Sequence, residues 1–410
     1  MWKSLAISLF SCSVLTAQQL GLPSELGGKP FFVTKTWTIG GEGDWNRLTL
    51  DPAAGWLYIA HGPVVQVVDV ETGALAGQIG GLGEAYAIAL DDTGEFGYIS
   101  DLKAGAILIF DRRSLQISAK IPVASAPRQL VYDPADHLLF AILTPPPIKG
   151  ATSKTVFHTV NGHLVPGPAP DLNPITPVAM IDTKTNTVLG QMLFSGRLGD
   201  ALFDGQDRLF VSVVDRNYVL RIDTHHVASL LQSQNGADPT TLDWSEIKAS
   251  EKARAAWAAP DHPDKIFLNS GCFEPVGLAV DTRQQRLFAV CKNMKLIVWN
   301  LGQDKLVATL PLNDAPDSLV YDPDRGLLFV ASGAGSGSLT IARRHITDSY
   351  TVLQDLPTRT FARSMAVNPV NGEVYLVTNL VGFDLTKPGG IGKLQTAPIL
   401  GSFQVMVVGD

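Results

Sequence analysis

The segment DSLVYDPDRGLLFVA, at residues 317–331, contains the pattern that decides the fold. A short apolar stretch leads to Asp322, a polar turn follows, and a second apolar stretch ends the segment. Turns that start with Asp-Pro or with Asp and polar residues join neighbouring antiparallel strands, because the aspartate side chain caps free backbone amides. The segment therefore predicts a β-hairpin with Asp322 in its turn, and we call such a turn residue an anchor.

The same pattern occurs seven times along the chain. The anchors are Asp51, Asp91, Asp133, Asp204, Asp281, Asp322 and Asn368. Most neighbouring anchors are about 40 residues apart, and two intervals are longer by roughly 30 to 35 residues. Because a second apolar pair follows the hairpin, as in VVQVVDVETGALAGQI at residues 64–79, each unit supplies four strands. The sequence predicts an all-β fold, a seven-bladed β-propeller with four-stranded antiparallel blades.

The two ends of this repeat array are incomplete in complementary ways. The segment FFVTKTWTIG, at residues 31–40, resembles an outer fourth strand without the three that should precede it. The last unit ends on FQVMVVGD, a third strand without a fourth. We therefore expect the N-terminal strand to close the last blade.

The first 17 residues have the layout of a secretory signal peptide, with Lys3 ahead of an apolar run and small or polar residues up to Ala17. We expect cleavage near Ala17, a periplasmic or secreted location in a bacterium, and a single domain over residues 18–410. Lipid attachment at Cys12 fits less well, because the bulky Phe10 stands where lipoprotein signals prefer small residues. No later apolar run is long enough to span a membrane, and we expect a soluble monomer.

The charge of the chain excludes one class of partner. The 410 residues carry a net charge of −7 without a long basic block, which argues against nucleic acid as a partner.

Two cysteines remain in the mature chain, Cys272 and Cys291, both in the fifth unit. Export to an oxidising compartment favours a disulfide between them, and two buried thiols are the alternative.

Two insertions interrupt the repeats, at residues 144–177 and 232–269. The first is rich in proline and predicts an extended meander, whereas the second contains WSEIKASEKARAAWAA, at residues 244–259, which predicts a helix. We expect both insertions, with the loops at residues 333–338 and 379–401, on the face where the innermost strands begin. The opposite face should carry only short turns.

Polar residues stand where the innermost strands begin, four or five positions before the anchors. With one residue from the end of a second strand, the candidates for a ligand site at this channel mouth are Tyr86, Arg128, Asp200, Asp317, Arg363 and His61. Paired guanidinium groups bind carboxylates and acidic side chains accept sugar hydroxyls, so a small anionic or polyhydroxylated ligand fits. Neutralisation of arginine by aspartate around a water-filled channel is the alternative.

Motifs of known catalytic chemistry are missing from the sequence. It contains no Gly-x-Ser-x-Gly elbow, phosphate loop or dinucleotide fingerprint, and no cysteine or histidine spacing matches a zinc site. His225 and His226 are predicted to lie in a hairpin turn. We predict no metal and no cofactor, and an enzymatic activity is not indicated.

The repeats resemble the YncE-like, YVTN-type β-propeller proteins of bacteria. The phrases that carry the resemblance are VVDVETGALAG (67–77), APRQLVYDPADHLLFAI (126–142), IDTKTNTVLGQ (181–191), APDSLVYDPDRGLLFVA (315–331) and ARSMAVNPVNGEVYLV (362–377). The resemblance implies the propeller fold, whereas propellers similar to it serve as sugar-lactone hydrolases, cofactor-bearing reductase domains and subunits of quinone-dependent dehydrogenases.

Our leading hypothesis is an exported, non-enzymatic scaffold that binds a small molecule or a protein through its long-loop face. One alternative is a lactonase-like hydrolase, in which an acid at the mouth or His61 activates water while Arg128 or Arg363 stabilises the oxyanion. The other is a redox module that holds a cofactor.

Overall fold

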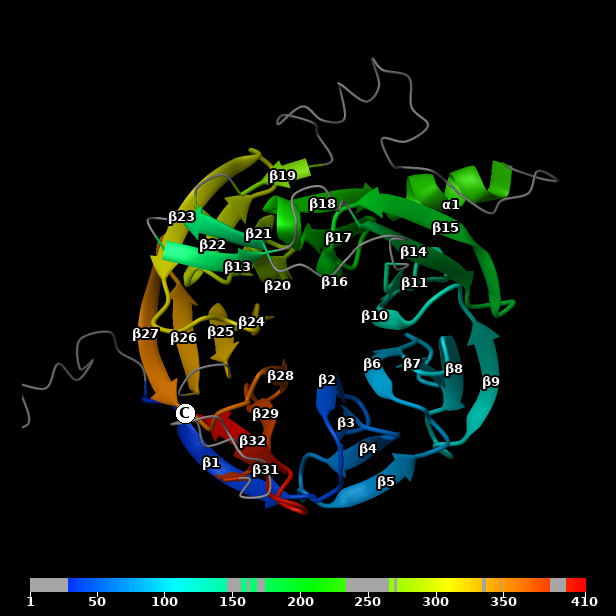
Figure 1. The fold of residues 1–410 in the computed structure, drawn as a ribbon, viewed down its shortest axis with the longest axis horizontal. Helices are drawn as coiled ribbons and strands as arrows, with labels where there is room; N and C mark the ends of the chain where they lie inside the picture. Colours follow the sequence, from blue (N-terminus) through cyan, green and yellow to red (C-terminus); the bar gives the residue numbers. More distant parts are fainter. Residues whose placement is uncertain are drawn as a thin grey trace, which may run out of the picture.

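The structure is a computed structural model that describes residues 29–145, 156–160, 163–167, 174–233, 265–268, 271–333, 337–346, 348–383 and 396–410. Seven four-stranded antiparallel sheets stand side by side in a ring (Figure 1). The predicted seven-bladed β-propeller is confirmed. The predicted signal peptide at residues 1–17 and the predicted helix at residues 244–259 lie outside the described residues.

Each blade runs from an innermost strand to an outer fourth strand. Blade 1 consists of β2 (Trp45–Asp51), β3 (Trp56–His61), β4 (Val64–Asp69) and β5 (Leu75–Ile79). Blade 2 consists of β6 (Ala85–Leu90), β7 (Phe96–Asp101), β8 (Ala106–Asp111) and β9 (Ile117–Pro122). Blade 3 consists of β10 (Pro127–Asp133), β11 (Leu138–Leu143), β14 (Ile175–Asp182) and β15 (Thr187–Ser195).

The later blades follow the same order, with one helical addition in blade 4. Blade 4 consists of β16 (Leu198–Phe203), β17 (Arg208–Val213), the 3-10 turn η2 (Val214–Arg216), β18 (Tyr218–Asp223), the helix α1 (Thr224–Ser233) and β19 (Lys265–Phe267). Blade 5 consists of β20 (Pro275–Asp281), β21 (Arg286–Cys291), β22 (Lys295–Asn300) and β23 (Lys305–Pro311). Blade 6 consists of β24 (Ser318–Asp322), β25 (Leu327–Ser332), β26 (Ser338–Arg344) and β27 (Tyr350–Pro357).

Blade 7 joins the two ends of the chain. Its three inner strands are β28 (Ser364–Val367), β29 (Val374–Thr378) and β32 (Gln404–Gly409), and its outer strand is β1 (Phe32–Thr38). Strand β1 pairs antiparallel with β32 from Phe32 opposite Gly409 to Thr38 opposite Gln404. Figure 1 shows the first and the last strand side by side in this blade. The predicted closure of the ring by the N-terminal strand is confirmed.

The anchors hold the turns between first and second strands as expected. Asp51 Oδ1 accepts the amides of Ala53 and Ala54 at 3.2 and 3.1 Å. Equivalent contacts to the residues two or three positions on recur at the other anchors: Asp91, Asp133, Asp204, Asp281, Asp322 and Asn368. The recurring acids are therefore turn caps, and they lie on the face that we call the anchor face.

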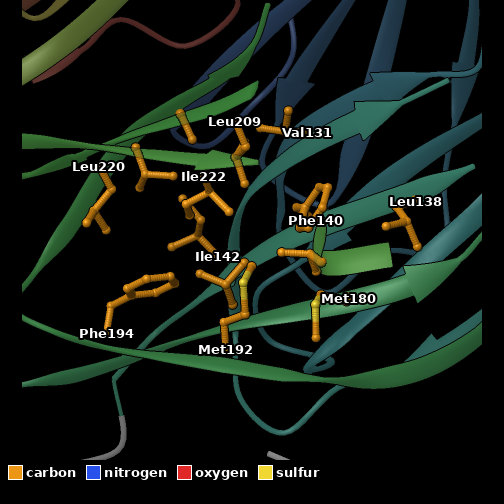
Figure 2. Close-up of a cluster of buried hydrophobic side chains, with 14 of the residues drawn as sticks. Val131, Leu138, Phe140, Ile142, Met180, Met192, Phe194, Leu209, Leu220 and Ile222 are labelled. Carbon is orange, nitrogen blue, oxygen red and sulfur yellow. The ribbon is translucent and has the colours of Figure 1, made fainter. Parts of the chain in front are cut away.

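The hydrophobic core lies between neighbouring blades, because each strand presents apolar residues to both sides. Figure 2 shows the cluster between blades 3 and 4, where Phe140 and Met192 of blade 3 pack with Leu220 of blade 4. Phe140, Met192 and Leu220 are almost fully buried. Each blade thus covers the faces of its two neighbours, which explains why a four-stranded sheet of this size is stable only within the ring.

The insertion at residues 232–269 does not leave the propeller where the sequence predicted. The third strand of blade 4 ends at Asp223 on the anchor face, α1 follows there, and the chain returns as the fourth strand, β19. The amide of Thr224 donates to the carbonyl of Asp207, in the anchor turn of blade 4, at 2.8 Å. The expectation that both insertions emerge on the channel-mouth face is therefore wrong, because the second one begins on the anchor face.

The prediction of a hairpin turn at His225 and His226 is also wrong. Both residues lie in the first turn of α1, and the amide of His226 donates to Asp223 Oδ1 at 2.7 Å. This aspartate caps the helix and replaces the hairpin turn that other blades form at this position.

The proline-rich insertion at residues 144–177 joins the second and third strands of blade 3, on the channel-mouth side, as expected. Within it, β12 (Val156–Val160) pairs with β13 (His163–Gly167) as a separate two-stranded sheet. A similar small sheet, of β30 (Val381–Phe383) and β31 (Thr396–Pro398), forms in the loop of blade 7. The expected extended conformation agrees with these strands, although the sequence analysis did not predict that they pair.

The disulfide between Cys272 and Cys291 is present, with the two Cα atoms 5.4 Å apart. Cys291 ends β21 opposite Pro275, and Cys272 lies just before the innermost strand of the same blade. Both side chains are buried. The bridge thus ties the segment that enters blade 5 to its second strand.

Replacing both Cys272 and Cys291 by alanine is expected to lower the free energy of unfolding by about 3 kcal/mol, because the bridge restricts the unfolded chain. Urea unfolding of the oxidised protein, the reduced protein and the double variant measures this loss. The reduced protein serves as the control for lost packing, since it keeps both sulfur atoms. Two free thiols titrated in the denatured, unreduced protein would contradict the prediction.

Candidate functional site

A cavity of about 480 Å³ lies where the innermost strands begin. Its lining side chains come from the first strands of all seven blades or from the residue just before such a strand. They are Asn46, Arg47, Leu48, Tyr86, Gln129, Asp200, Ala201, Leu202, Leu278, Asp317, Ser318, Leu319, Val320, Arg363, Ser364 and Met365. Four of the six predicted candidates, Tyr86, Asp200, Asp317 and Arg363, therefore surround one cavity.

The lining is arranged in two layers along the strands. Residues five or four positions before an anchor form what we call the upper layer: Asn46, Arg47, Tyr86, Gln129, Asp200, Asp317, Ser318, Arg363 and Ser364. Residues three or two positions before an anchor form the lower layer: Leu48, Ala201, Leu202, Leu278, Leu319, Val320 and Met365. Every side chain of the upper layer has a polar atom, and every side chain of the lower layer is apolar. The cavity is thus polar at its mouth and apolar below.

An ion pair crosses the upper layer from blade 1 to blade 4. Arg47 Nη1 donates to Asp200 Oδ1 at 2.7 Å, and the amide of Leu278 in blade 5 donates to Asp200 Oδ2 at 2.9 Å. Gln129 of blade 3 directs its Nε2 to the carbonyl of Ala201 at 3.1 Å, and its Oε1 has no partner and is shut off from solvent. Asp200 itself is only 9% exposed. Gln129 Nε2 also lies 3.5 Å from Asp200 Oδ1, so this carboxylate connects blades 1, 3, 4 and 5, and most of its hydrogen-bonding capacity is used within the protein.

The second acid of the cavity, Asp317, is also engaged. Its Oδ1 accepts Lys292 Nζ at 2.9 Å, and its Oδ2 accepts the amide of Gly333 at 2.8 Å. Lys292 further donates to the carbonyl of Pro316 at 2.9 Å. The negative charge of Asp317 is thus offset by a lysine beside the cavity.

The guanidinium group of Arg363 lies over an aromatic ring of the neighbouring blade. Its Cζ is 5.6 Å from the centre of the Trp45 ring, and Nη2 donates to the carbonyl of Trp45 at 3.0 Å. Ser318 Oγ fixes the backbone of the same residue by donating to the Arg363 carbonyl at 2.7 Å. These contacts set the direction of the side chain and leave Nε and Nη1 of Arg363 without a partner among the described residues.

Arg128 makes an equivalent pair outside the cavity. Its Cζ lies 5.6 Å from the centre of the Tyr86 ring, and the arginine side chain is exposed at the surface. Only the tyrosine of this pair lines the cavity. Arg128 therefore stands at the rim, next to the site rather than inside it.

His61 lies apart from the cavity and is 1% exposed. Its Nδ1 is 2.8 Å from Gln66 Oε1, its Nε2 is 3.2 Å from the carbonyl of Gly43, and its ring lies 4.0 Å from that of Phe403. With both ring nitrogens within hydrogen-bonding distance of protein oxygens, this histidine is placed to support the loop before β2. It is not placed to activate water in the cavity.

The acidic side chains at or just after the ends of second strands accept hydrogen bonds from loop amides on the mouth face. Asp101 accepts the amides of Gly83, Glu84 and Ala104, and Asp215 accepts the amide of Arg197. No group of three or more histidine, cysteine, aspartate or glutamate side chains is arranged to bind a metal ion within the described part of the chain. No helix among the same residues is long and apolar enough to cross a membrane.

The sequence analysis missed three charged or amide side chains of the upper layer as site residues: Asn46, Arg47 and Gln129. Arg47 and Gln129 stand four positions before their anchors, whereas the candidates were mainly sought five positions before them. The pairing of β10 with β11 shifts between Pro127 and Gln129, and that of β2 with β3 shifts between Trp45 and Leu48. Such bulges change which of two consecutive side chains faces the cavity.

No family model matches the chain, and no curated protein matches it by sequence. A chain of the "Crystal Structure of Mitotic Checkpoint Complex" superposes with a TM-score of 0.59 and 13% identity, over 97% of this chain and 99% of that one. The "Structure of U3-55K" gives 0.58 and 11%, over 90% and 97%, respectively.

The "Crystal structure of RRP9 WD40 repeats" gives a TM-score of 0.58 and 12% identity, over 90% of this chain and 96% of that one. At these identities the likeness concerns the fold alone, because one fold carries many unrelated functions. The chain is therefore a seven-bladed propeller similar in fold to WD40-repeat proteins.

Proposed function

We propose that the protein is an exported, YncE-like propeller that acts as a non-enzymatic binding scaffold, and that its cavity binds a small carboxylate ligand. The observation that carries the proposal is the presence of two guanidinium groups, Arg47 and Arg363, on neighbouring blades around one cavity. Arginine forks match the two oxygens of a carboxylate and form charge-assisted hydrogen bonds with them.

The balance of charge in the cavity supports an anionic ligand. Arg47 is paired with Asp200, and Asp317 is paired with Lys292, so these four charges cancel. Arg363 has no carboxylate partner among the described residues, and it is fixed only by the ring and the carbonyl of Trp45. One positive charge is therefore left over, which a ligand with a single negative charge would balance.

Export is supported by the leader-like sequence up to Ala17 and by the disulfide, since such bridges persist in oxidising compartments. In the second version of the proposed scaffold, the same face binds a protein instead of a small molecule. Sequencing the N-terminus of the protein recovered from the culture fluid or the periplasm tests export. An intact N-terminus in the cytosol would contradict it.

Arg363→Ala is expected to weaken the binding of a carboxylate by roughly tenfold to a hundredfold, because a charge-assisted hydrogen bond contributes about 1.5 to 3 kcal/mol. The probes are the six-carbon acids hexanoate and gluconate, with hexanol as an uncharged comparison, followed by NMR titration and calorimetry. Arg283→Ala is the matched control, since Arg283 forms an exposed pair with Asp324 on the anchor face. If neither acid binds the wild-type protein, or if Arg363→Ala binds them unchanged, the proposal is wrong.

A further inference from the structure

The lower layer of the cavity is apolar on every blade that contributes to it. Leu202 of blade 4 and Val320 of blade 6 line it while remaining only half-buried, so their side chains are partly open to the cavity. The two layers extend over four consecutive strand positions, a depth of about 10 Å. A ligand held at the upper layer therefore has room for a body that reaches an apolar surface below.

The polar groups of the upper layer are mostly committed to the protein itself. Asp200 accepts from Arg47 and from the amide of Leu278, and Asn46 Nδ2 donates to the carbonyl of Ala85 at 3.1 Å. The engaged groups also include Asp317, Ser318 and the amide nitrogen of Gln129, as described above. A ligand with many hydroxyls would lose its hydrogen bonds to water on binding. Few groups of the upper layer are free to replace those hydrogen bonds.

The uncommitted groups of the upper layer are mainly cationic. Arg363 keeps two nitrogens and Arg47 keeps its Nε and Nη2 without partners among the described residues. The neutral groups left over there are the hydroxyls of Tyr86 and Ser364, the side-chain oxygen of Asn46, and the side-chain oxygen of Gln129, which is shut off from solvent. This inventory matches one carboxylate group and does not match a row of hydroxyls.

From this arrangement we propose that the ligand is an amphiphilic monocarboxylate, whose carboxylate lies at Arg363 and Arg47 and whose apolar body fills the lower layer. The inference rests on the proposed carboxylate binding and specifies the other half of the ligand. Burial of the body against Leu202 and Val320 supplies affinity through the hydrophobic effect, and the arginines set its orientation.

Titration of the wild-type protein with acetate, butyrate, hexanoate and gluconate tests the inference. Each added methylene should tighten binding about fourfold while the lower layer fills, and hexanoate should bind at least tenfold more tightly than gluconate, which has the same carbon chain with five hydroxyls. Equal affinities from acetate to hexanoate, or tighter binding of gluconate than of hexanoate, would overturn the inference that the ligand has an apolar body. Gluconate binding that Arg363→Ala abolishes would still leave the carboxylate site in place, whereas failure of all four acids would overturn both proposals.

Two isosteric variants locate the apolar body. Val320→Thr places a hydroxyl in the lower layer at nearly constant volume and should weaken hexanoate about threefold to tenfold while leaving acetate unchanged. Val276→Thr is the control, because Val276 is the second residue of the innermost strand of blade 5 and does not line the cavity. Hexanoate binding that responds equally to both variants, or to neither, would contradict the assignment of the lower layer.

Discussion

A protein that lacks residues 1–40 is expected to aggregate and to lose on the order of 5 kcal/mol of its free energy of unfolding. The deletion removes β1 and so exposes the backbone edge of β32, where six residue pairs define the present register. It also removes Trp37, whose ring stacks on Tyr375 with centroids 6.0 Å apart, and the backbone of Phe31, which exchanges two hydrogen bonds with Gln354 of blade 6. Calorimetry and size-exclusion chromatography with light scattering measure both effects.

A shorter deletion is the control for this experiment. Removal of residues 1–28 leaves β1 intact and should change neither the melting temperature nor the elution volume. If the protein without residues 1–40 melts at the same temperature as the one without residues 1–28, β1 does not hold the ring closed.

Arg112→Met is expected to cost about 3 to 5 kcal/mol of stability, because it leaves two buried carboxylates without their cation. The guanidinium group of Arg112 contacts Asp51 of blade 1 and Asp91 of blade 2, and it is largely buried between the two blades. Both acids are anchors, so the arginine links two turn caps. Burial raises the pKa of the nearby Tyr58 hydroxyl to about 12, so at neutral pH this tyrosine is uncharged and adds no further negative charge beside the two carboxylates.

The matched control is Arg283→Met on the same face of the molecule. Arg283 and Asp324 form a salt bridge at 2.6 Å in which both side chains are well exposed, and such pairs contribute about 0 to 1 kcal/mol. Urea unfolding at neutral pH compares the two variants. Equal losses for Arg112→Met and Arg283→Met would show that burial of the Arg112 group does not determine its contribution.

The fold could be predicted from the sequence because each blade repeats a local signal. An aspartate that caps its own turn is recognisable without knowledge of the tertiary structure, and the short apolar runs on both sides of Asp322, at residues 319–321 and 327–331, have the length of buried strands. The ring closure followed from counting strands at the two ends. Both predictions depend on contacts within a few residues or on a repeat, which a single sequence contains.

The departures arose where the repeat is interrupted. Strand β19 has only three residues, Lys265–Phe267, and more than 30 residues separate it from its partner β18. So short a strand has no periodicity of its own, and the insertion was therefore assigned to the loop between blades. The helix α1 was missed for a related reason: its cap, Asp223, stands at the position where other blades begin a hairpin turn.

The sequence predicted where the candidate site lies, but it identified only some of the residues that form it. Counting back from the anchors found the mouth, and Tyr86, Asp200, Asp317 and Arg363 do meet there. Arg128 lies outside because the register of β10 shifts immediately after Pro127. A bulge of this kind depends on how neighbouring strands twist against each other, and the sequence around it carries no signal that would distinguish it from a regular strand start.

The pairing of β1 with β32 also determines when folding can finish. Residues 32–38 and 404–409 are separated by almost the whole chain, so this contact has the greatest loop-closure cost in the molecule. Blades 1 to 6 can each assemble from consecutive residues, but the seventh must wait until its third strand has been synthesised. During that interval the segment Phe32–Thr38 has to stay free of other strand edges, and the ring stays open until its C-terminal strand arrives.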